Sequence, residues 1–189
     1  MDVMNAVLTR RSVNRLGGPP PSEELILELL RAASTVPDHG RLKPWRLTVL
    51  QGEERKALGE ALAAVAPPEQ AARAREKPFR APMLISIVFC PDRHHPKVPE
   101  WEQLASAATL VNTLHLLLHS RGWGAIWRTG AVIDAPEVRA CAGVGATERL
   151  LGWLYVGRPD PEAALPPRPP FDPGTKIRFL GSADPSETS

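Results

Sequence analysis

The chain has only two cysteines in 189 residues, almost no net charge and no long apolar run. Two cysteines cannot build a disulfide framework, and we expect Cys90 and Cys141 to be buried and reduced, as in a reducing compartment. A formal net charge of +2 gives no electrostatic case for a nucleic-acid partner. No apolar run approaches the roughly 18 residues that a membrane helix needs, so we expect no membrane partner.

Familiar catalytic and metal-binding patterns are also missing. The sequence shows no conventional triad, and adjacent His94 and His95 would point in opposite directions in an extended segment. No cysteine or carboxylate pattern completes a metal site around them, so we predict neither a metal nor a catalytic side chain. The N-terminus lacks the apolar segment of a secretory signal, which makes a cytoplasmic location the expectation.

The patterns that are present predict one domain with helices on both faces of a sheet. Met83 to Phe89 is a nearly continuous apolar run, typical of a central buried strand. Ser22 can cap a helix that ends before Pro37. Further strands are expected at 45–50, 123–127 and 150–156. Further helices are expected at 2–9, 53–65, 99–120 and 135–141, and another follows Pro67-Pro68 and ends at about Glu76.

Two segments suggest contact with another chain. The helix over 99–120 is apolar on nearly all sides, which places it either at the centre of the domain or in a subunit interface. Seven prolines lie between Pro159 and Pro173, and such a segment cannot form a helix or an inner strand. We therefore divide the chain into a domain of residues 1–158 and a proline-rich arm and tail of residues 159–189, loose beyond Gly181.

Three polar patches could hold a ligand. Two guanidinium groups and a hydroxyl in Arg10-Arg11-Ser12 can grip a phosphate, although a solvated helix end is the simpler reading. Pro37-Asp38-His39 is either a turn or a ligand contact. Trp127-Arg128-Thr129 ends a strand and could address a ring carbonyl or a phosphate. Gly122 and Gly124 follow a helix and precede a strand, which is the reverse of a dinucleotide fingerprint, so Gly122 is better read as a helix terminator.

Taken together, these segments resemble the nitroreductase family of FMN enzymes, and most closely its minimal YdjA-type branch. The resemblance runs from Met1 to about Pro159, and its specificity lies in the order and spacing of the segments. The matching residues are Arg10-Arg11-Ser12, Arg31-Ala32, Pro37-Asp38-His39, Pro44-Trp45, Pro78-Phe79-Arg80-Ala81-Pro82, His95 with Lys97-Val98-Pro99, Trp101-Glu102-Gln103, Gly122 with Gly124, Ile126-Trp127-Arg128-Thr129-Gly130, and Gly152 with Leu154-Tyr155.

The resemblance implies an α+β, nitroreductase-like fold with a mixed central sheet in three α-β-α layers. It also implies a homodimer with FMN at the subunit interface. By similarity, one subunit holds FMN through Arg10, Arg11, Ser12, Trp127, Arg128 and Thr129, and the neighbouring subunit contributes His39 and position 35. That position is Thr35 where the family pattern has arginine, so a cation is lost there. The nicotinamide nucleotide is expected along Leu117, Leu118, His119, Ser120, Arg121 and Gly122.

The implied activity is reduction of FMN by NADH or NADPH, followed by electron transfer to an acceptor such as a nitroaromatic or a quinone. Because the flavin carries the redox chemistry, no acid–base pair is required of the protein. A cation near flavin N1 would favour the reduced form, and Arg11 and Arg128 are both candidates. Two alternatives remain: a reductase of one dedicated metabolite, and a non-catalytic FMN carrier or sensor.

Overall fold

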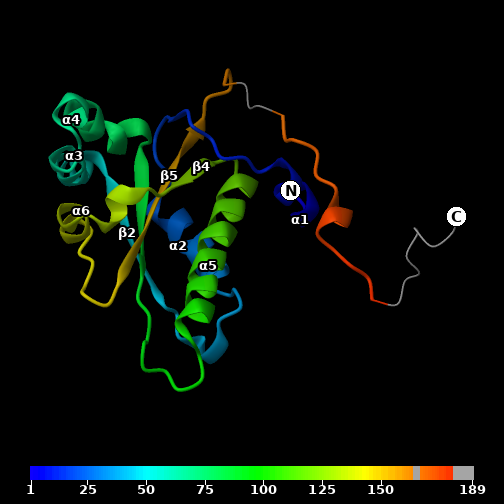
Figure 1. The fold of residues 1–189 in the computed structure, drawn as a ribbon. Coiled ribbons are helices and arrows are strands. Elements are labelled where there is room, and N and C mark those ends of the chain that lie inside the picture. Colours follow the sequence, from blue (N-terminus) through cyan, green and yellow to red (C-terminus); the bar gives the residue numbers. More distant parts are fainter. Residues whose placement is uncertain (164–166, 181–189) are drawn as a thin grey trace, which may run out of the picture.

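A computed structural model describes residues 1–163 and 167–180 and shows a sheet between two layers of helices (Figure 1). The expectation of a loose tail beyond Gly181 lies outside the described residues. The elements of regular structure are α1 (Val3–Thr9), β1 (Leu16–Gly17), α2 (Glu23–Ala33), β2 (Trp45–Gln51), α3 (Arg55–Ala64), α4 (Pro68–Arg75), β3 (Met83–Phe89), α5 (Glu100–Ser120), β4 (Gly124–Arg128), α6 (Pro136–Cys141) and β5 (Arg149–Pro159).

The sheet has the strand order β1-β5-β3-β2, and β4 also pairs with β5. All of these strand pairs are antiparallel. Among the described residues, the parallel component of the expected mixed sheet is a single isolated bridge between Ser12 and Ala125. The two-residue strand β1 is not among the strands expected from the sequence.

Both faces of the sheet are buried, which explains the uninterrupted apolar run of β3. Met83, Ile85 and Ile87 face one core with α2 and α5, while Leu84 and Val88 face a second core with α3, α4 and α6. Successive side chains of a strand point to opposite faces, so a strand covered on both sides must be apolar at nearly every position. The expected three-layer α-β-α arrangement is confirmed.

The ends of the helices follow local sequence signals. Ser22 caps α2 by accepting a hydrogen bond from the backbone N–H of Leu25. Gly122 adopts a φ of 75° just past α5, and Trp123 N–H then bonds the carbonyl of Leu118 at 3.0 Å. This left-handed residue ends the helix as expected and directs the chain into β4.

The arm after β5 turns back toward the start of the chain. Arg168 donates hydrogen bonds to the carbonyls of Val7 and Arg10, so the arm crosses the C-terminal end of α1. Phe171 and Phe179 stay largely exposed on it, as do Val3 and Leu8 on α1. The expectation of buried cysteines was wrong for Cys141, which is exposed at the end of α6, while Cys90 is partly buried.

Candidate functional site

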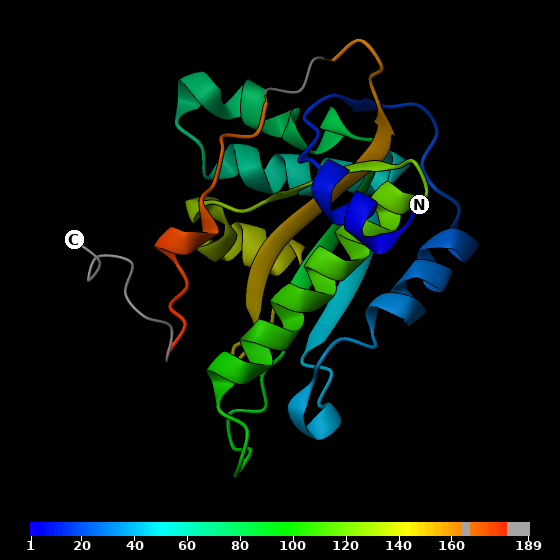
Figure 2. The same ribbon diagram turned by 90° about the vertical axis from the view of Figure 1, so that its right-hand side faces the viewer.

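The first predicted patch, Arg10-Arg11-Ser12, lies between the end of α1 and the edge of the sheet (Figure 2). Ser12 bridges Ala125 of β4, and Val13 N–H bonds the carbonyl of Ala125 at 3.0 Å. Arg10 reaches the C-terminal half of α5, where its Nη1 lies 3.5 Å from Nε2 of His115. A segment of four residues is therefore fixed against both the sheet and the long helix.

The electrostatics of this patch are those of a site for an anion. Burial, followed by the charges of Arg168 and Arg11, lowers the pKa of Arg10. Burial and the charge of Arg10 also lower the pKa of His115 to about 4, so this imidazole is neutral at neutral pH. Since two further guanidinium groups lie close enough to disfavour the charge of Arg10, a phosphate placed among the three would be favoured.

Arg168 is a member of this group that the sequence did not reveal. It comes from the proline-rich arm and is separated from Arg10 by more than 150 residues in sequence, yet it donates to the carbonyl of Arg10. A lone arginine among prolines carries no local signal for a binding role. Only the path of the arm brings it to the patch.

The third predicted patch, Trp127-Arg128-Thr129, ends β4 beside a hollow of about 330 Å³ that these residues help to line. Trp127 is held in place by a 2.8 Å hydrogen bond from its Nε1 to the carbonyl of Leu151. Gly152 allows the strands to approach here, because a Cβ at this position would lie 2.1 Å from the carbonyl oxygen of Arg128. The register between β3 and β5 also shifts beside Gly152, as at a β-bulge, so β5 is irregular where it meets the end of β4.

Arg128 has a buried donor without a protein partner among the described residues. Its Nη2 bonds Oδ1 of Asn14 at 2.9 Å, and its guanidinium lies 5.5 Å from the ring centre of Tyr155. Its Nε is buried without a hydrogen-bond partner among the described residues. A buried donor of this kind costs free energy unless a ligand or water satisfies it. Arg80, which lines the same hollow, was not assigned a role from the sequence.

The second predicted patch lies at the opposite end of α5. Nδ1 of His39 is 2.8 Å from Oε2 of Glu102 in the first turn of that helix, whereas Arg10 reaches His115 near its end. At 1.5 Å per residue, Glu102 and His115 are separated by about 20 Å along the helix axis. Thr35, also exposed, is turned back onto the carbonyl of Ala32. Within one chain, therefore, His39 and Arg10 do not form one compact site.

The stretch expected to meet the nicotinamide nucleotide forms the last turn and the end of α5. Leu118 is fully buried in the core and Leu117 packs against it. His119 is partly buried and bonded to Thr9, while Ser120 bonds back to the helix, and Arg121 and Gly122 are exposed. A nucleotide here would meet the polar end of the stretch, and its role stays a prediction.

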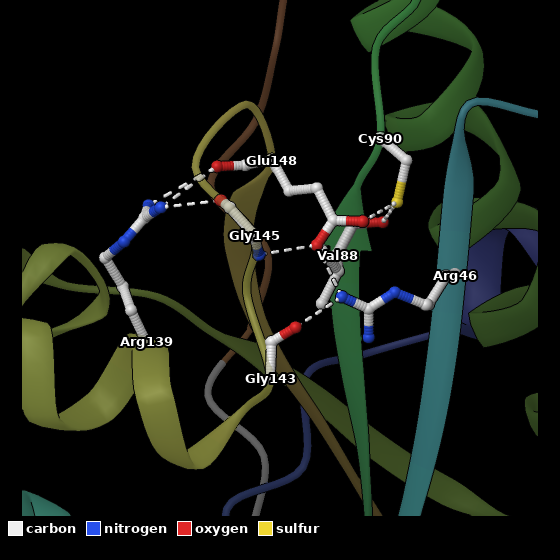
Figure 3. A network of polar contacts seen from close by, with 7 residues as sticks. All are labelled: Arg46, Val88, Cys90, Arg139, Gly143, Gly145 and Glu148. Atoms are coloured by element: carbon white, nitrogen blue, oxygen red, sulfur yellow. Dashed lines mark hydrogen bonds and ion pairs between the residues drawn. The ribbon is translucent and has the colours of Figure 1, made fainter.

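Another polar network lies where β2 begins and β3 ends, and it holds the loop before β5 in place (Figure 3). Glu148 accepts hydrogen bonds from Arg46 at 2.5 Å, from the backbone of Gly145 at 2.8 Å and from the thiol of Cys90 at 3.2 Å. The bond from Arg46 and then that from Gly145 lower the pKa of Glu148 to about 2. Burial, and then Glu148, raise the pKa of the Cys90 thiol to about 11. A protonated thiol is a poor nucleophile, so this network secures the loop before β5.

Within residues 1–163 and 167–180, no three histidine, cysteine or acidic side chains are grouped as a metal site would require. In the same residues, none of the helices combines the length and apolar character needed to cross a membrane.

Comparison with known proteins identifies the family. The model of the nitroreductase family matches residues 7–158. YdjA of Escherichia coli K12, named as a candidate NAD(P)H nitroreductase, is 36% identical over 169 residues, covering 87% of this chain and 92% of YdjA. A candidate NAD(P)H nitroreductase of Haemophilus influenzae is 30% identical over 162 residues, covering 83% of this chain and 88% of its own. The chain therefore belongs to the nitroreductase family.

Solved structures show the same fold. A nitroreductase-like protein from Bacillus cereus superposes with a TM-score of 0.84 at 24% identity, covering 96% of this chain and 97% of its own. The FMN-dependent nitroreductase NfnB of Mycobacterium smegmatis, solved with NADPH, gives a TM-score of 0.73 at 17% identity, covering 93% and 96%. The expected α+β, nitroreductase-like fold is confirmed.

Proposed function

We propose that this protein is an FMN-dependent oxidoreductase that takes electrons from NADH or NADPH and passes them to a small acceptor such as a nitroaromatic or a quinone. The observations that carry the proposal are two features along the β4 edge. One is the cluster of positive charge formed by Arg10, Arg11 and Arg168. The other is Nε of Arg128, which is buried without a hydrogen-bond partner among the described residues. Relatives of this chain are named as candidate NAD(P)H nitroreductases, and a solved protein of the same fold is named as an FMN-dependent nitroreductase.

FMN carries the chemical groups that these two features would take. Its phosphate would lie among Arg10, Arg11 and Arg168, with the hydroxyl of Ser12 toward the ribityl chain. Its ring would lie toward the end of β4, where a ring carbonyl would satisfy Nε of Arg128. Ser12 and Arg128 both lie along the edge formed by β4, so one extended cofactor can reach both.

The protein's contribution is binding, orientation and electrostatics. Bound FMN supplies the capacity to accept a hydride from a nicotinamide and to release electrons to a second molecule. Trp127 and Thr129, which line the hollow, would border the ring, and the charge of Arg128 would favour an electron-rich ring beside it. Arg10, Arg11 and Arg168 would hold the phosphate non-covalently.

We also propose that the working unit is a homodimer in which each FMN is shared. His39 lies about 20 Å along α5 from the Arg10 region of its own chain, so its expected flavin contact requires a second subunit. The exposed apolar side chains of α1 and of the arm flank the same region, and they would be buried by such a partner.

A reconstitution experiment tests the cofactor, and a mixing experiment tests the sharing. Apoprotein incubated with FMN should gain flavin absorption that is lost on denaturation, and should then oxidise NADH or NADPH in the presence of an acceptor. Failure to bind FMN at micromolar concentration would refute the function, while binding without turnover would favour a carrier or sensor. Arg10→Ala and His39→Ala subunits, each weak alone, should regain activity when refolded together, since the mixed dimer has one intact site.

A further inference from the structure

A second and larger concavity of about 870 Å³ lies beside the proposed flavin site. Its walls are the turn at residues 14–18 and the chain leaving β5 at residues 158–161, with Arg80 and Arg128 on the side shared with the flavin hollow. Nothing in the proposed flavin site requires the outer part of this concavity. Its volume falls in the range of small-molecule sites, which is about 300–1,000 Å³.

The lining of this concavity is strongly basic. It contains the arginines Arg15, Arg80, Arg128 and Arg158 and a single carboxylate, that of Asp160. Asp160 forms an ion pair with Arg15 at 3.5 Å. Three guanidinium groups thus share the concavity without a carboxylate of their own among its lining residues. Such a surface selects an anionic ligand.

Arg158 is fixed in position and still has donors to offer. Its guanidinium lies 3.7 Å from the ring centre of Trp123, and its Nη1 donates to the carbonyl of Gly122 at 3.3 Å. An arginine has five N–H donors in a planar fork, so a single bond to a carbonyl leaves most of the fork available. Stacking on a buried tryptophan reduces the entropy that the side chain would lose on gripping an anion.

The position of the concavity indicates which anion it meets. Arg128 joins it to the flavin hollow, and Arg158 joins it to Gly122, where the stretch expected to meet the nicotinamide nucleotide ends. A molecule that places a flat ring on the flavin and carries phosphates a short distance away would fill both spaces. Among the reactants of the proposed reaction, the nicotinamide dinucleotide has this chemistry.

We propose that this concavity is the phosphate-binding site for NADH or NADPH, with Arg15 and Arg158 as its principal anion-binding side chains. The proposal rests on the function proposed above, because it uses the same flavin as the partner of the nicotinamide. Arg158 supplies a fixed fork for a phosphate group. Arg15, whose guanidinium pairs with Asp160, can exchange that exposed ion pair for a phosphate, because such surface pairs contribute little.

The test uses Arg158→Gln and Arg15→Gln in the FMN-loaded protein, with Arg73→Gln on the exposed surface of α4 as the control. Rapid mixing with NADH or NADPH gives the dissociation constant of each coenzyme from the way the rate of flavin bleaching depends on coenzyme concentration. We expect this constant to rise about tenfold or more in the two site variants, as for a lost hydrogen bond between charged groups. Arg158→Lys, which keeps the charge but not the fork, should fall between Arg158→Gln and the parent.

The choice of coenzyme and inhibitor separates the two phosphate sources. If the site variants weaken the binding of NADH and NADPH equally, the pyrophosphate lies in the concavity. If they weaken the binding of NADPH alone, the 2′-phosphate lies there. Inorganic pyrophosphate, or adenosine 2′,5′-bisphosphate, should correspondingly compete with the coenzyme in the parent and lose potency in the variants.

The proposal is overturned if both site variants bind both coenzymes within twofold of the parent. A change seen only in the KM of the electron acceptor would overturn it as well. Flavin content separates this failure from failure of the proposed function, because a protein that binds FMN and is bleached normally by NADH or NADPH retains that function.

Discussion

Replacing Arg10 with alanine is the sharpest single test of the phosphate site. If Arg10 holds the FMN phosphate, its loss removes a hydrogen bond between charged groups worth about 1.5–3 kcal/mol. That free energy corresponds to a roughly 10- to 150-fold rise in the dissociation constant of FMN. Calorimetric titration of the apoprotein with FMN measures it directly, and Arg73→Ala on α4 provides a variant that loses a cation elsewhere.

The structure adds a second, opposite effect on the apoprotein. Because burial and the neighbouring charges of Arg168 and Arg11 lower the pKa of Arg10, the fold disfavours this cation while no anion is bound. Removing it should leave the Tm of the apoprotein unchanged or raise it, while FMN binds more weakly. If Tm falls and FMN affinity is unchanged, Arg10 is a structural cation at a helix end, and the reasoning is refuted.

Three further predictions concern the partner subunit, the carboxylate that contacts His39, and acid stability. Deleting residues 160–189 should weaken both dimerisation and FMN retention, and unchanged light scattering and flavin content would show that the arm contributes to neither. Glu102→Ala should weaken FMN binding, as His39→Ala should, because Glu102 orients the imidazole of His39. Glu102→Gln keeps a hydrogen-bond acceptor and should weaken FMN binding less. Parental FMN affinity of Glu102→Ala in calorimetric titration would contradict this prediction. Glu148 has a folded pKa of about 2, below its usual value of 4.5, so the stability it contributes with Arg46 is present above about pH 4.5 and is lost as the pH falls toward 2. Glu148→Gln should therefore lower the free energy of unfolding by about 1–2 kcal/mol at neutral pH and reduce its fall toward acid pH. Urea unfolding of the parent and the variant from pH 7 to pH 2 measures this. The prediction is wrong if the two plots of unfolding free energy against pH stay parallel.

Local signals were enough for most of the regular structure. The apolar run of β3, the cap at Ser22 and the left-handed Gly122 each depend on a few adjacent residues, and all were found as expected. The short strand β1 was missed, because two residues are too few for a hydrophobic period to show. The exposure of Cys141 was also missed, because an apolar setting in sequence does not reveal which face of a short helix meets solvent.

The candidate site was only partly visible in the sequence. Arg10-Arg11-Ser12 and Trp127-Arg128-Thr129 stood out because each concentrates ligand-binding side chains in three adjacent residues. Arg168 and Arg158 did not, since each is a single arginine whose importance depends on what lies across from it. Arg168 gains its place from the carbonyl of Arg10, and Arg158 from the ring of Trp123.

The sequence by itself determined the elements, the family and the residue types available for an anionic cofactor, because these follow from periodicity and from the order of short motifs. Only the tertiary structure decided which of those residues meet. Long-range contacts are set by how helices and strands pack, and packing brought Arg168 to Arg10 while it placed His39 at the other end of α5. The proposal of a site shared between subunits follows from that separation, and no local pattern in the chain encodes a distance of this kind.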